Sequence, residues 1–225
     1  MKLYYHPVST TSRPVLLFAA EHGLALDLQS VDLFTGEHLQ PAFAAINPNR
    51  QVPVLEDGAF RLTESSAILK YLAERVGSPA YPREPQARAR VNELMDWFNC
   101  GLSRELCYGI VYPQLFPHLK RPTEQAQAQA IAWARPFARR WLDVLDEDLL
   151  GPRRTFLGGD APCLADYTGA AMITLGESVQ LDYSHWRNVS RWIDRMKARP
   201  AWAPSNAGFY QYLVAPLAER RFEGL

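Results

Sequence analysis

In the first half of the chain, short strand-like segments alternate with segments whose apolar residues recur at helical spacing. The segment "KLYY" at residues 2–5 predicts a strand, and Val15 to Ala20 predict a helix with Ser12 as its cap and Pro14 in its first turn. The alternating segment "LALDLQSVDL" at residues 24–33 predicts a second strand. A short helix or turn region follows at residues 38–47.

The next part of the pattern predicts a hairpin and a closing helix. The segments "VPVLED" and "AFRLT" flank the dipeptide Asp57-Gly58, which is typical of tight hairpins. After the hairpin, Ile68, Leu69 and Leu72 recur at helical spacing. The resulting order, β-α-β-α-β-β-α, predicts a small mixed sheet with helices packed on it. A helix separates the first two strands, so we expect them to run parallel.

The second half of the chain predicts helices only. It begins after "GSPAYPREPQ", a Pro- and Gly-containing stretch typical of a linker. Apolar residues at helical spacing form two stripes, which are Val91, Leu94, Met95, Phe98, Leu102 and Leu106, and then Trp133, Phe137, Trp141, Val144 and Leu145. Pro136 is expected to kink the second helix. We therefore expect an α/β domain at 1–77, a linker at 78–86 and an all-helical domain at 87–225.

Composition narrows the class of protein. Of the 225 residues, 48% are hydrophobic and 21% are charged, as in soluble globular proteins. The 24 basic and 24 acidic residues give a formal net charge of zero, so the protein has no overall positive electrostatic potential that would attract nucleic acid. The N-terminus does not have the pattern of a signal peptide, and no stretch reaches the roughly 18 apolar residues of a membrane span. We expect a cytoplasmic protein that binds neither nucleic acid nor membrane.

The cysteines and histidines do not predict a metal site. Cys100, Cys107 and Cys163 form no C-x-x-C motif, and no Cys/His group has the spacing of zinc ligands. We therefore expect no metal. Cys100 and Cys107 are seven positions apart, on one face of a predicted helix, so we expect both to be buried.

Hydroxyl side chains mark the connection after the first strand. Ser9, Thr10, Thr11 and Ser12 lie at the start of the predicted helix, where the dipole favours a bound anion. A bound thiolate fits, because one charge-assisted hydrogen bond of about 1.5–3 kcal/mol lowers a thiol pKa by about one to two units. Ser9 precedes the expected cap and is the freer hydroxyl, with Thr10 and Thr11 as alternatives. The first 99 residues contain no cysteine, which argues against thiol–disulfide exchange.

Two other segments carry candidate binding groups. In "TESS", Thr63 can cap the closing helix and Glu64 can complement its dipole, or the same groups can hold a bound anion or zwitterion. A cis Val52–Pro53 bond would push residue 52 outward and leave its backbone free to pair with a peptide ligand. His38 is either a surface residue without a role or a carboxylate-binding one.

The chain resembles the cytosolic glutathione transferases over essentially its whole length. The stretches that carry this resemblance are "LYYHPVSTTSRPV", "VDLFTGEHLQPAFAAINPNRQVPVLEDGAFRLTESSAILKYLAE", "QARARVNELMDW" and "GGDAPCLADYT". The resemblance implies the glutathione transferase fold, an α/β thioredoxin-like domain with a mixed four-stranded sheet followed by an all-α domain. "VDLFTGEHLQPAF" and "QARARVNE" are most similar to the theta-type subgroup and its bacterial dehalogenase relatives.

The resemblance also implies roles for individual residues. Ser9 corresponds to the serine that stabilises the glutathione thiolate. The positions that correspond to glutathione-binding residues are His38, Gln51, Val52, Pro53, Glu64 and Ser65. Glu64 would hold the γ-glutamyl ammonium group and Ser65 the adjacent carboxylate.

The resemblance also implies which residues would bind the cysteinyl unit and the glycyl end of glutathione. The backbone of Val52, before a cis Pro53, would pair with the cysteinyl unit, and Gln51 and His38 would lie near the glycyl carboxylate. Two positions depart from the family. Thr10 replaces the reactive cysteine of beta-type members, and Cys163 replaces the usual Ser or Thr that caps "CLAD", where a thiol caps poorly.

The implied activity is that of a glutathione transferase in detoxification. Glutathione is the co-substrate, and its thiolate would attack a small hydrophobic electrophile, with alkyl halides favoured by the theta-type resemblance. Family members are homodimers, and the second substrate would lie between the domains, where the candidate lining residues are Phe34, Asn99, Ser103, Tyr108, Phe209, Tyr210 and Tyr212. The alternative is a non-catalytic glutathione-binding or protein-interaction module with the same fold.

Overall fold

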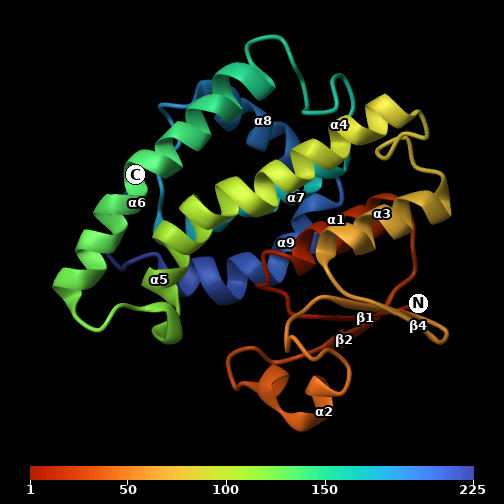
Figure 1. Cartoon of the computed structure of the whole chain (residues 1–225), viewed down its shortest axis with the longest axis horizontal. Coiled ribbons are helices and arrows are strands. Elements are labelled where there is room, and N and C mark those ends of the chain that lie inside the picture. The colour runs from red at the N-terminus through yellow and green to blue at the C-terminus, as the bar shows by residue number, and fades with distance from the viewer.

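A four-stranded mixed sheet forms the centre of the N-terminal half of the computed structural model, which describes residues 1–225 (Figure 1). The strands, in the order β2-β1-β3-β4, are β1 (Lys2–Tyr5), β2 (Asp27–Ser30), β3 (Val54–Asp57) and β4 (Phe60–Leu62). β1 runs parallel to β2 and antiparallel to β3, and β3 and β4 form the hairpin at Gly58. The predicted element order, the parallel first pair and the hairpin are confirmed.

Helices cover both faces of this sheet. The elements are α1 (Ser12–Glu21), the 3₁₀ turn η1 (Glu37–Leu39), α2 (Pro41–Ala44) and α3 (Ser65–Val76). Leu3 and Leu55 belong to the core cluster that contains the buried residues of α1 and α3, whereas Val54 packs with Phe43 of α2 in a separate cluster. The alternation along each strand therefore assigns one face to α1 and α3 and the other to α2.

The second half is helical throughout. Its α-helices are α4 (Pro85–Asp96), α5 (Tyr112–Leu115), α6 (Glu124–Val144), α7 (Leu164–Leu175), α8 (Arg187–Lys197) and α9 (Trp202–Phe209). Wider, π-type turns continue several of them, as η2 (Trp97–Val111), η4 (Leu145–Leu150) and η6 (Tyr210–Val214), and short 3₁₀ turns are η3 (Pro117–Leu119), η5 (Gly176–Val179) and η7 (Ala215–Leu217). None of the helices is both long and apolar enough to cross a membrane.

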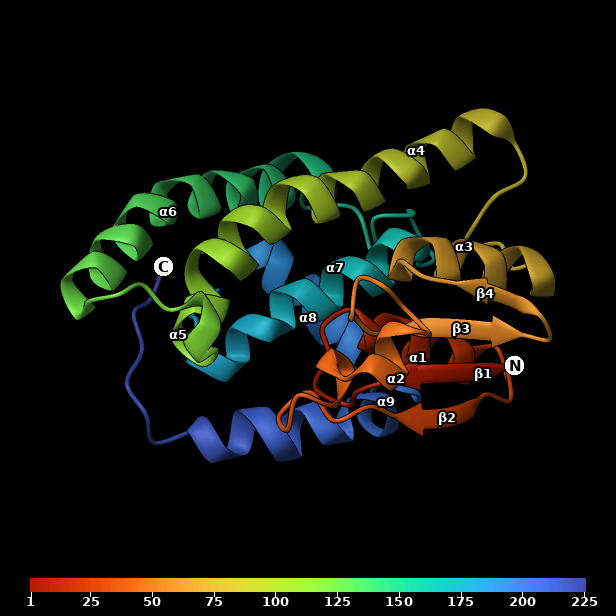
Figure 2. The same ribbon diagram turned by 60° about the horizontal axis from the view of Figure 1, so that its bottom comes forward.

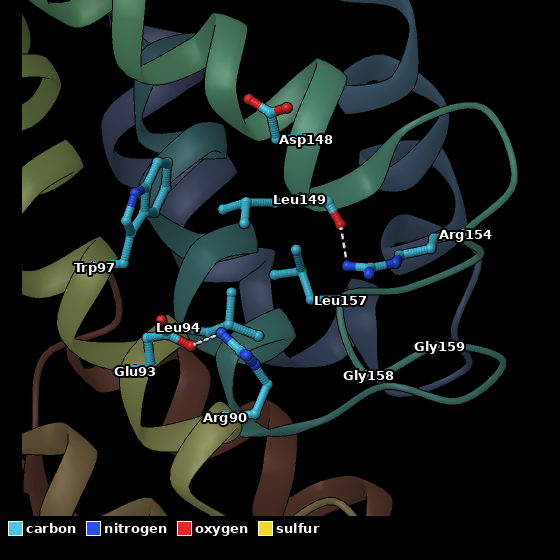
Figure 3. A pocket seen from close by; sticks show the side chains of 10 residues that line it. All are labelled: Arg90, Glu93, Leu94, Trp97, Asp148, Leu149, Arg154, Leu157, Gly158 and Gly159. Carbon is cyan, nitrogen blue, oxygen red and sulfur yellow. Dashed lines mark hydrogen bonds and ion pairs between the residues drawn. The ribbon is translucent and has the colours of Figure 1, made fainter. Parts of the chain in front are cut away.

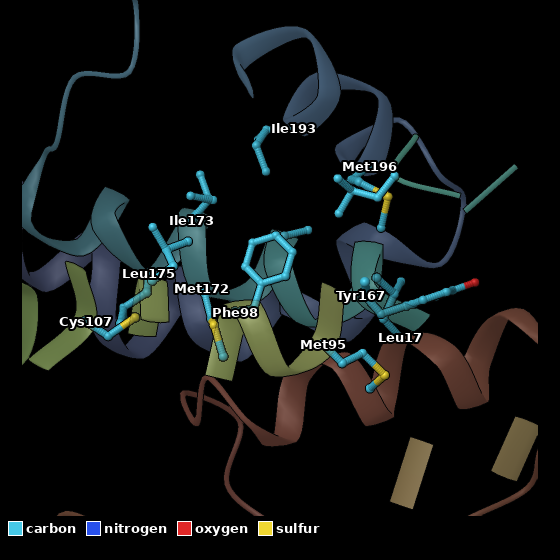
Figure 4. Packing of buried hydrophobic residues seen from close by; sticks show 14 of the residues in the cluster. Leu17, Met95, Phe98, Cys107, Tyr167, Met172, Ile173, Leu175, Ile193 and Met196 are labelled. Atoms are coloured by element: carbon cyan, nitrogen blue, oxygen red, sulfur yellow. The ribbon is translucent and has the colours of Figure 1, made fainter. Parts of the chain in front are cut away.

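Helix α7 is buried on every side. All 12 of its residues are buried, and it contacts α1, α4 and α8, lying below α4 in Figure 2. Side chains from α1, α4, η2, α7 and α8 meet around Phe98 (Figure 4). The 47 buried residues of this cluster include Leu3 and Leu55 of the sheet, so one continuous core joins both halves.

Asp166 accepts several hydrogen bonds at the start of this buried helix. Its carboxylate accepts hydrogen bonds from the backbone N–H groups of Cys163 (2.8 Å), Leu157 (2.8 Å) and Gly158 (3.3 Å) and from the Trp192 indole (2.8 Å). Cys163 and Asp166 form a capping box at the N-terminus of α7. The weak cap expected from the Cys163 thiol is thus supplemented by a carboxylate three residues later.

The predicted apolar stripe of α4 and η2 is confirmed. The second predicted stripe is wrong for Trp133 and Phe137, whereas Leu145 is buried and Trp141 packs against the core. Trp133 and Phe137 are exposed, at 74% and 42% of their surface. The buried side of α6 is instead formed by Gln127, Ile131, Ala134, Ala138 and Leu142. Small residues face η2 because the two helices lie very close together. A Cβ atom placed on Gly109 would lie 2.8 Å from the Ala134 Cβ atom.

The expectation that Cys100 and Cys107 are both buried is half wrong. Cys107 is buried and Cys100 is exposed. The cause is the π-type turn of η2, which holds more residues than an α-turn, so positions seven apart no longer share a face. Burial raises the pKa of the Cys107 thiol to about 12.

Gly101 tests the close approach of η2 and α6. A Cβ atom at this position would lie 2.1 Å from the ring of Trp141. We expect Gly101→Ala to lower the free energy of unfolding by about 1–3 kcal/mol, as overpacking does in other cores. Urea denaturation at fixed protein concentration measures this. Gly224→Ala is the matched control, because no atom lies within 4 Å of its Cβ position. Equal stabilities of the two variants would contradict the packing described here.

Candidate active site

The pairing of the strands brings four loops to one edge of the sheet. Tyr5 lies beside Ser30 in the parallel pair, Tyr4 pairs with Val54, and Leu55 pairs with Leu62. The ends of β1, β2 and β4 and the start of β3 are therefore at the same edge. The predicted site residues all lie on these loops or at their ends, at positions 9, 38, 51–53 and 64–65.

The hydroxyl groups after β1 form a hydrogen-bonded chain. Thr11 Oγ1 donates to the Val52 carbonyl (3.0 Å) and lies 3.1 Å from Ser9 Oγ. A hydroxyl has one proton, and that of Thr11 is used on Val52, so Ser9 donates to Thr11. Ser9 Oγ also accepts from the Ser12 N–H (3.2 Å). The expected role of Ser12 as the cap is wrong, because Ser12 is the first residue of α1. Thr11 occupies the cap position and forms no side-chain hydrogen bond to the helix.

Thr10 is turned toward the helical half of the molecule. It is buried, and its hydroxyl accepts a hydrogen bond of 3.0 Å from Tyr112 of α5. Burial raises the pKa of Tyr112, so this phenol stays protonated and remains a donor. Ser9 and Thr11, but not Thr10, therefore form the hydrogen-bonded chain that leads to Val52.

The Val52–Pro53 bond is cis. The Val52 side chain is not pushed outward, contrary to expectation. It is buried with Val31, Phe43 and Val54. The Val52 N–H donates to no protein group, while its carbonyl accepts only from Thr11. One backbone donor thus remains free beside the hydroxyl chain.

The N-terminus of α3 has no side-chain cap. Thr63 does not cap it, contrary to expectation, because Glu64 occupies the cap position and no side chain bonds to the free N–H groups. Glu64 has φ 63° and ψ 113°, a region that costs a non-glycine residue about 1–3 kcal/mol. Its carboxylate is exposed and forms no ion pair, and the Ser65 hydroxyl has no protein partner. An uncapped helix start, a free acid and a free hydroxyl are therefore adjacent.

The remaining predicted binding residues lie on neighbouring loops. His38 is in the one-turn helix η1, and its Nδ1 atom is buried without a partner. Gln51 is exposed, and its carbonyl accepts from the Asn47 side chain (2.7 Å). His6, which sequence reasoning did not single out, lies at the end of β1 and accepts the Val8 N–H at Nδ1 (3.3 Å).

The candidate residues for a second substrate divide into surface and core. Phe34, Tyr108 and Tyr212 are more than half exposed, at 58%, 52% and 54%. Phe209 is fully buried, so it is a core residue and not a lining residue. Asn99 donates to Ser66 (2.6 Å) and thereby ties η2 to the first turn of α3.

A separate cavity lies in the helical half, away from the four loops. Its volume is about 530 Å³, and it lies between α4, η4 and the loop that precedes α7 (Figure 3). Its charged groups are engaged locally, since Arg90 pairs with Glu93 and Arg154 donates to the Leu149 carbonyl (2.7 Å). It contains none of the predicted site residues. No group of three or more His, Cys, Asp or Glu side chains is arranged to hold a metal ion.

Comparison with known proteins decides the family. Residues 8–75 match the glutathione S-transferase N-terminal domain, and residues 110–200 match the glutathione S-transferase C-terminal domain. A delta-class glutathione transferase of Nilaparvata lugens is 32% identical with a TM-score of 0.78, over 96% of this chain and 98% of that one. The chain belongs to the glutathione S-transferase family. It is a glutathione S-transferase, and the co-substrate of this family is glutathione.

Other glutathione S-transferases share the whole architecture. The apo form of human glutathione-S-transferase T1-1 is 28% identical with a TM-score of 0.82, over 99% of this chain and 92% of that chain. Glutathione transferase F7 from Populus trichocarpa is 27% identical with a TM-score of 0.79, over 92% of this chain and 98% of that chain. The thioredoxin-like sheet domain and the helical domain of the glutathione transferase fold are therefore both present.

His6 gives the stability of this glutathione S-transferase a pH dependence. Burial lowers its pKa from 6.5, against the opposing effect of Asp32. The unfolded chain therefore binds more protons than the folded one just below pH 6.5, and stability falls as pH drops through this range. We expect urea denaturation at pH 7.5 and 5.5 to show a larger loss for wild type than for His6→Asn. The exposed His185→Asn variant should behave as wild type. An equal loss in His6→Asn would exclude His6 as the cause.

Proposed function

We propose that this glutathione S-transferase uses Ser9 to stabilise the thiolate of bound glutathione. The thiolate attacks a small apolar electrophile, for which the theta-type resemblance favours an alkyl halide. In that reaction the carbon–sulfur bond forms as the carbon–halogen bond breaks, and the halide leaves with the bonding electron pair. Proximity and thiolate stabilisation are the sources of rate.

The observation that carries the proposal is the N-terminus of α3. Its N–H groups are uncapped, Glu64 adopts a strained conformation there, and the Glu64 and Ser65 side chains are free of protein partners. A γ-glutamyl group offers an ammonium and a carboxylate on one carbon. In the proposed complex, Glu64 binds the ammonium, and Ser65 with the helix N–H groups binds the carboxylate.

The rest of the tripeptide extends from this point along the sheet edge. The free Val52 N–H and the Val52 carbonyl, next to the cis Pro53, pair with the backbone of the cysteinyl unit. The cysteinyl sulfur then lies at the Ser9–Thr11 hydroxyl chain. The side chains of Gln51 and His38 are proposed to contact the glycyl carboxylate.

The hydroxyl chain supports Ser9 as the donor to the thiolate. In this chain the Thr11 proton is used on the Val52 carbonyl and the Ser9 proton goes only to the Thr11 oxygen. Thr10 is buried against Tyr112, outside the chain. A thiolate is a charged acceptor, and it competes well with the neutral Thr11 oxygen for the Ser9 proton. Ser9 remains anchored by the Ser12 N–H while its proton turns toward the ligand.

The proposal keeps the remaining expectations from the sequence. Residues 1–77 bind glutathione, residues 87–225 supply the electrophile site, and residues 78–86 link them. The protein acts in the cytoplasm, in detoxification, as a homodimer of the theta-like type. The exposed Trp133 and Phe137 on α6, whose rings are 5.6 Å apart, support a partner surface on this helix.

Replacement of Ser9 tests the thiolate role. We expect Ser9→Ala to raise the pKa of the bound glutathione thiol by about one to two units, because one charge-assisted hydrogen bond of about 1.5–3 kcal/mol is lost. The thiolate absorbance, titrated with pH, measures this, and Thr10→Val is the control. If the low thiol pKa survives in Ser9→Ala, the hydroxyl donor is Thr11 or Thr10. If wild type does not lower the thiol pKa at all, the non-catalytic binding module is favoured.

Replacement of Glu64 tests the recognition of the γ-glutamyl group. We expect Glu64→Gln to weaken glutathione binding by about tenfold or more, since a charge-assisted contact with the ammonium becomes neutral. Calorimetric titration measures the dissociation constant. Cysteinylglycine lacks the γ-glutamyl group, so its affinity should be the same for both proteins. An equal loss of affinity for the two ligands would place Glu64 away from the ammonium.

A further inference from the structure

Arg13 is a buried cation in the first turn of α1. It is 1% exposed, and its side chain leaves the sheet domain for the helical one. Its Nε atom donates to Asn206 Oδ1 of α9 (2.8 Å), and its Nη2 atom donates to Thr174 Oγ1 of α7 (2.5 Å). The guanidinium carbon lies 3.8 Å from the ring centre of Phe209. Three side chains from two helices thus hold one guanidinium group.

No carboxylate forms a direct ion pair with this charge, and Glu177 favours it only from beyond ion-pair distance. Arg13 is absent from every ion pair of the molecule, and its Nη1 atom is buried without a hydrogen-bond partner. Burial lowers its pKa to about 10, so the group is still charged at neutral pH. A buried charge without a directly paired opposite charge is a poor stabiliser of a fold, and apolar residues at such positions are often equally stable or better. Stability alone therefore does not account for Arg13.

The backbone of Arg13 holds the loop that carries Ser9. The Arg13 N–H donates to the Ser9 carbonyl (3.1 Å), and the Ser12 N–H donates to both the Ser9 carbonyl (3.1 Å) and Ser9 Oγ (3.2 Å). These bonds close the first turn around Ser9. A displacement of this turn moves the Ser9 hydroxyl directly.

Helix α9 contacts the same loop from its other end. It lies beside α1, below it in Figure 2. Gly208 of α9 packs so closely on Pro7 that a Cβ atom on Gly208 would lie 2.4 Å from the Pro7 Cβ atom. α9 therefore contacts the chain two residues before Ser9, through Pro7, and four residues after it, through Arg13.

We propose that Arg13 is a positioning residue, which fixes the Ser9 hydroxyl by docking the first turn of α1 onto Thr174, Asn206 and Phe209. The proposal rests on the thiolate role of Ser9 described above. It adds a specific dependence of that role on helices α7 and α9, which are remote in sequence from the loop. Arg13 does not touch the substrate in this arrangement.

The experiment removes the Arg13 contacts in two ways. Thr174→Val is nearly isosteric and removes the acceptor for Nη2. The Thr174 hydroxyl otherwise bonds only to the Ala170 and Ala171 carbonyls of its own helix. Arg13→Lys keeps the charge and loses the planar fork and its stacking on Phe209. Thr168→Val is the matched control, because Thr168 is buried in the same helix and bonds only to the Leu164 carbonyl.

Three readouts separate positioning from a merely structural role. They are the pKa of the bound glutathione thiol, kcat/KM, and the dissociation constant of S-methylglutathione, which has no thiol. We expect kcat/KM to fall about threefold in Thr174→Val and about tenfold in Arg13→Lys, with a raised thiol pKa in both, because the donor to the thiolate is misplaced. Binding of S-methylglutathione should stay within about twofold, and Thr168→Val should match wild type.

A double-mutant cycle tests whether the effect runs through Ser9. In a Ser9→Ala background, Thr174→Val should cause no further rise in the thiol pKa. If Ser9→Ala raises the thiol pKa and Thr174→Val and Arg13→Lys do not, the positioning role is overturned and the proposed function stands. A Thr174→Val effect that persists in Ser9→Ala also overturns it. If Ser9→Ala itself leaves the thiol pKa unchanged, the role of Ser9 fails and the positioning role fails with it.

Discussion

The structure depends on the capping of a helix that has no access to water. α7 is buried on all sides, so the N–H groups of its first turn have to find acceptors inside the protein. The Ala80 carbonyl accepts from the Leu164 N–H, and Cys163 accepts from the Asp166 N–H. The Asp166 carboxylate accepts from the Cys163 N–H, from the loop before the helix and from Trp192 of α8. One carboxylate thus fixes the start of α7, the path of the preceding loop and the docking of α8. The core that joins both halves of the molecule is built around this helix.

The sheet edge supplies the groups of the site, and the helical half holds them in place. Tyr112 of α5 bonds to Thr10, Asn99 of η2 bonds to Ser66, and α7 and α9 hold the guanidinium of Arg13. Each of these contacts involves a residue next to, or within four positions of, a predicted glutathione-binding residue. The helical half of this glutathione S-transferase therefore fixes the position of the loops that carry the predicted glutathione-binding residues.

The expectations that the structure corrects concern which side chains face the core and which cap a helix. Regular helical spacing predicts Trp133 and Cys100 in the core, but η2 and α6 approach at small residues and η2 is wound more widely than an α-helix. At α3, the residue expected to cap leaves the cap position to Glu64. In α1, Ser12 is the first helical residue instead of the cap, and its N–H donates to Ser9 Oγ. The burial or capping role that the local sequence favours for a residue is lost where a neighbouring element or a strained backbone conformation uses the same space or hydrogen-bonding groups.

The sequence by itself determined the order of the elements, the Asp57-Gly58 hairpin, the apolar stripe of α4 and η2, and the family, because turn residues, local periodicity and motif spacing are short-range properties. It also pointed to the loops that carry the candidate site, since each follows or precedes a predicted strand at one edge of the sheet. Only the tertiary structure decided which hydroxyl donates to which, how α6 faces η2, and what surrounds Arg13. The two hydrogen-bonding partners of Arg13 lie 161 and 193 positions away along the chain. Contacts over such separations arise from packing, and no local pattern of residues encodes them.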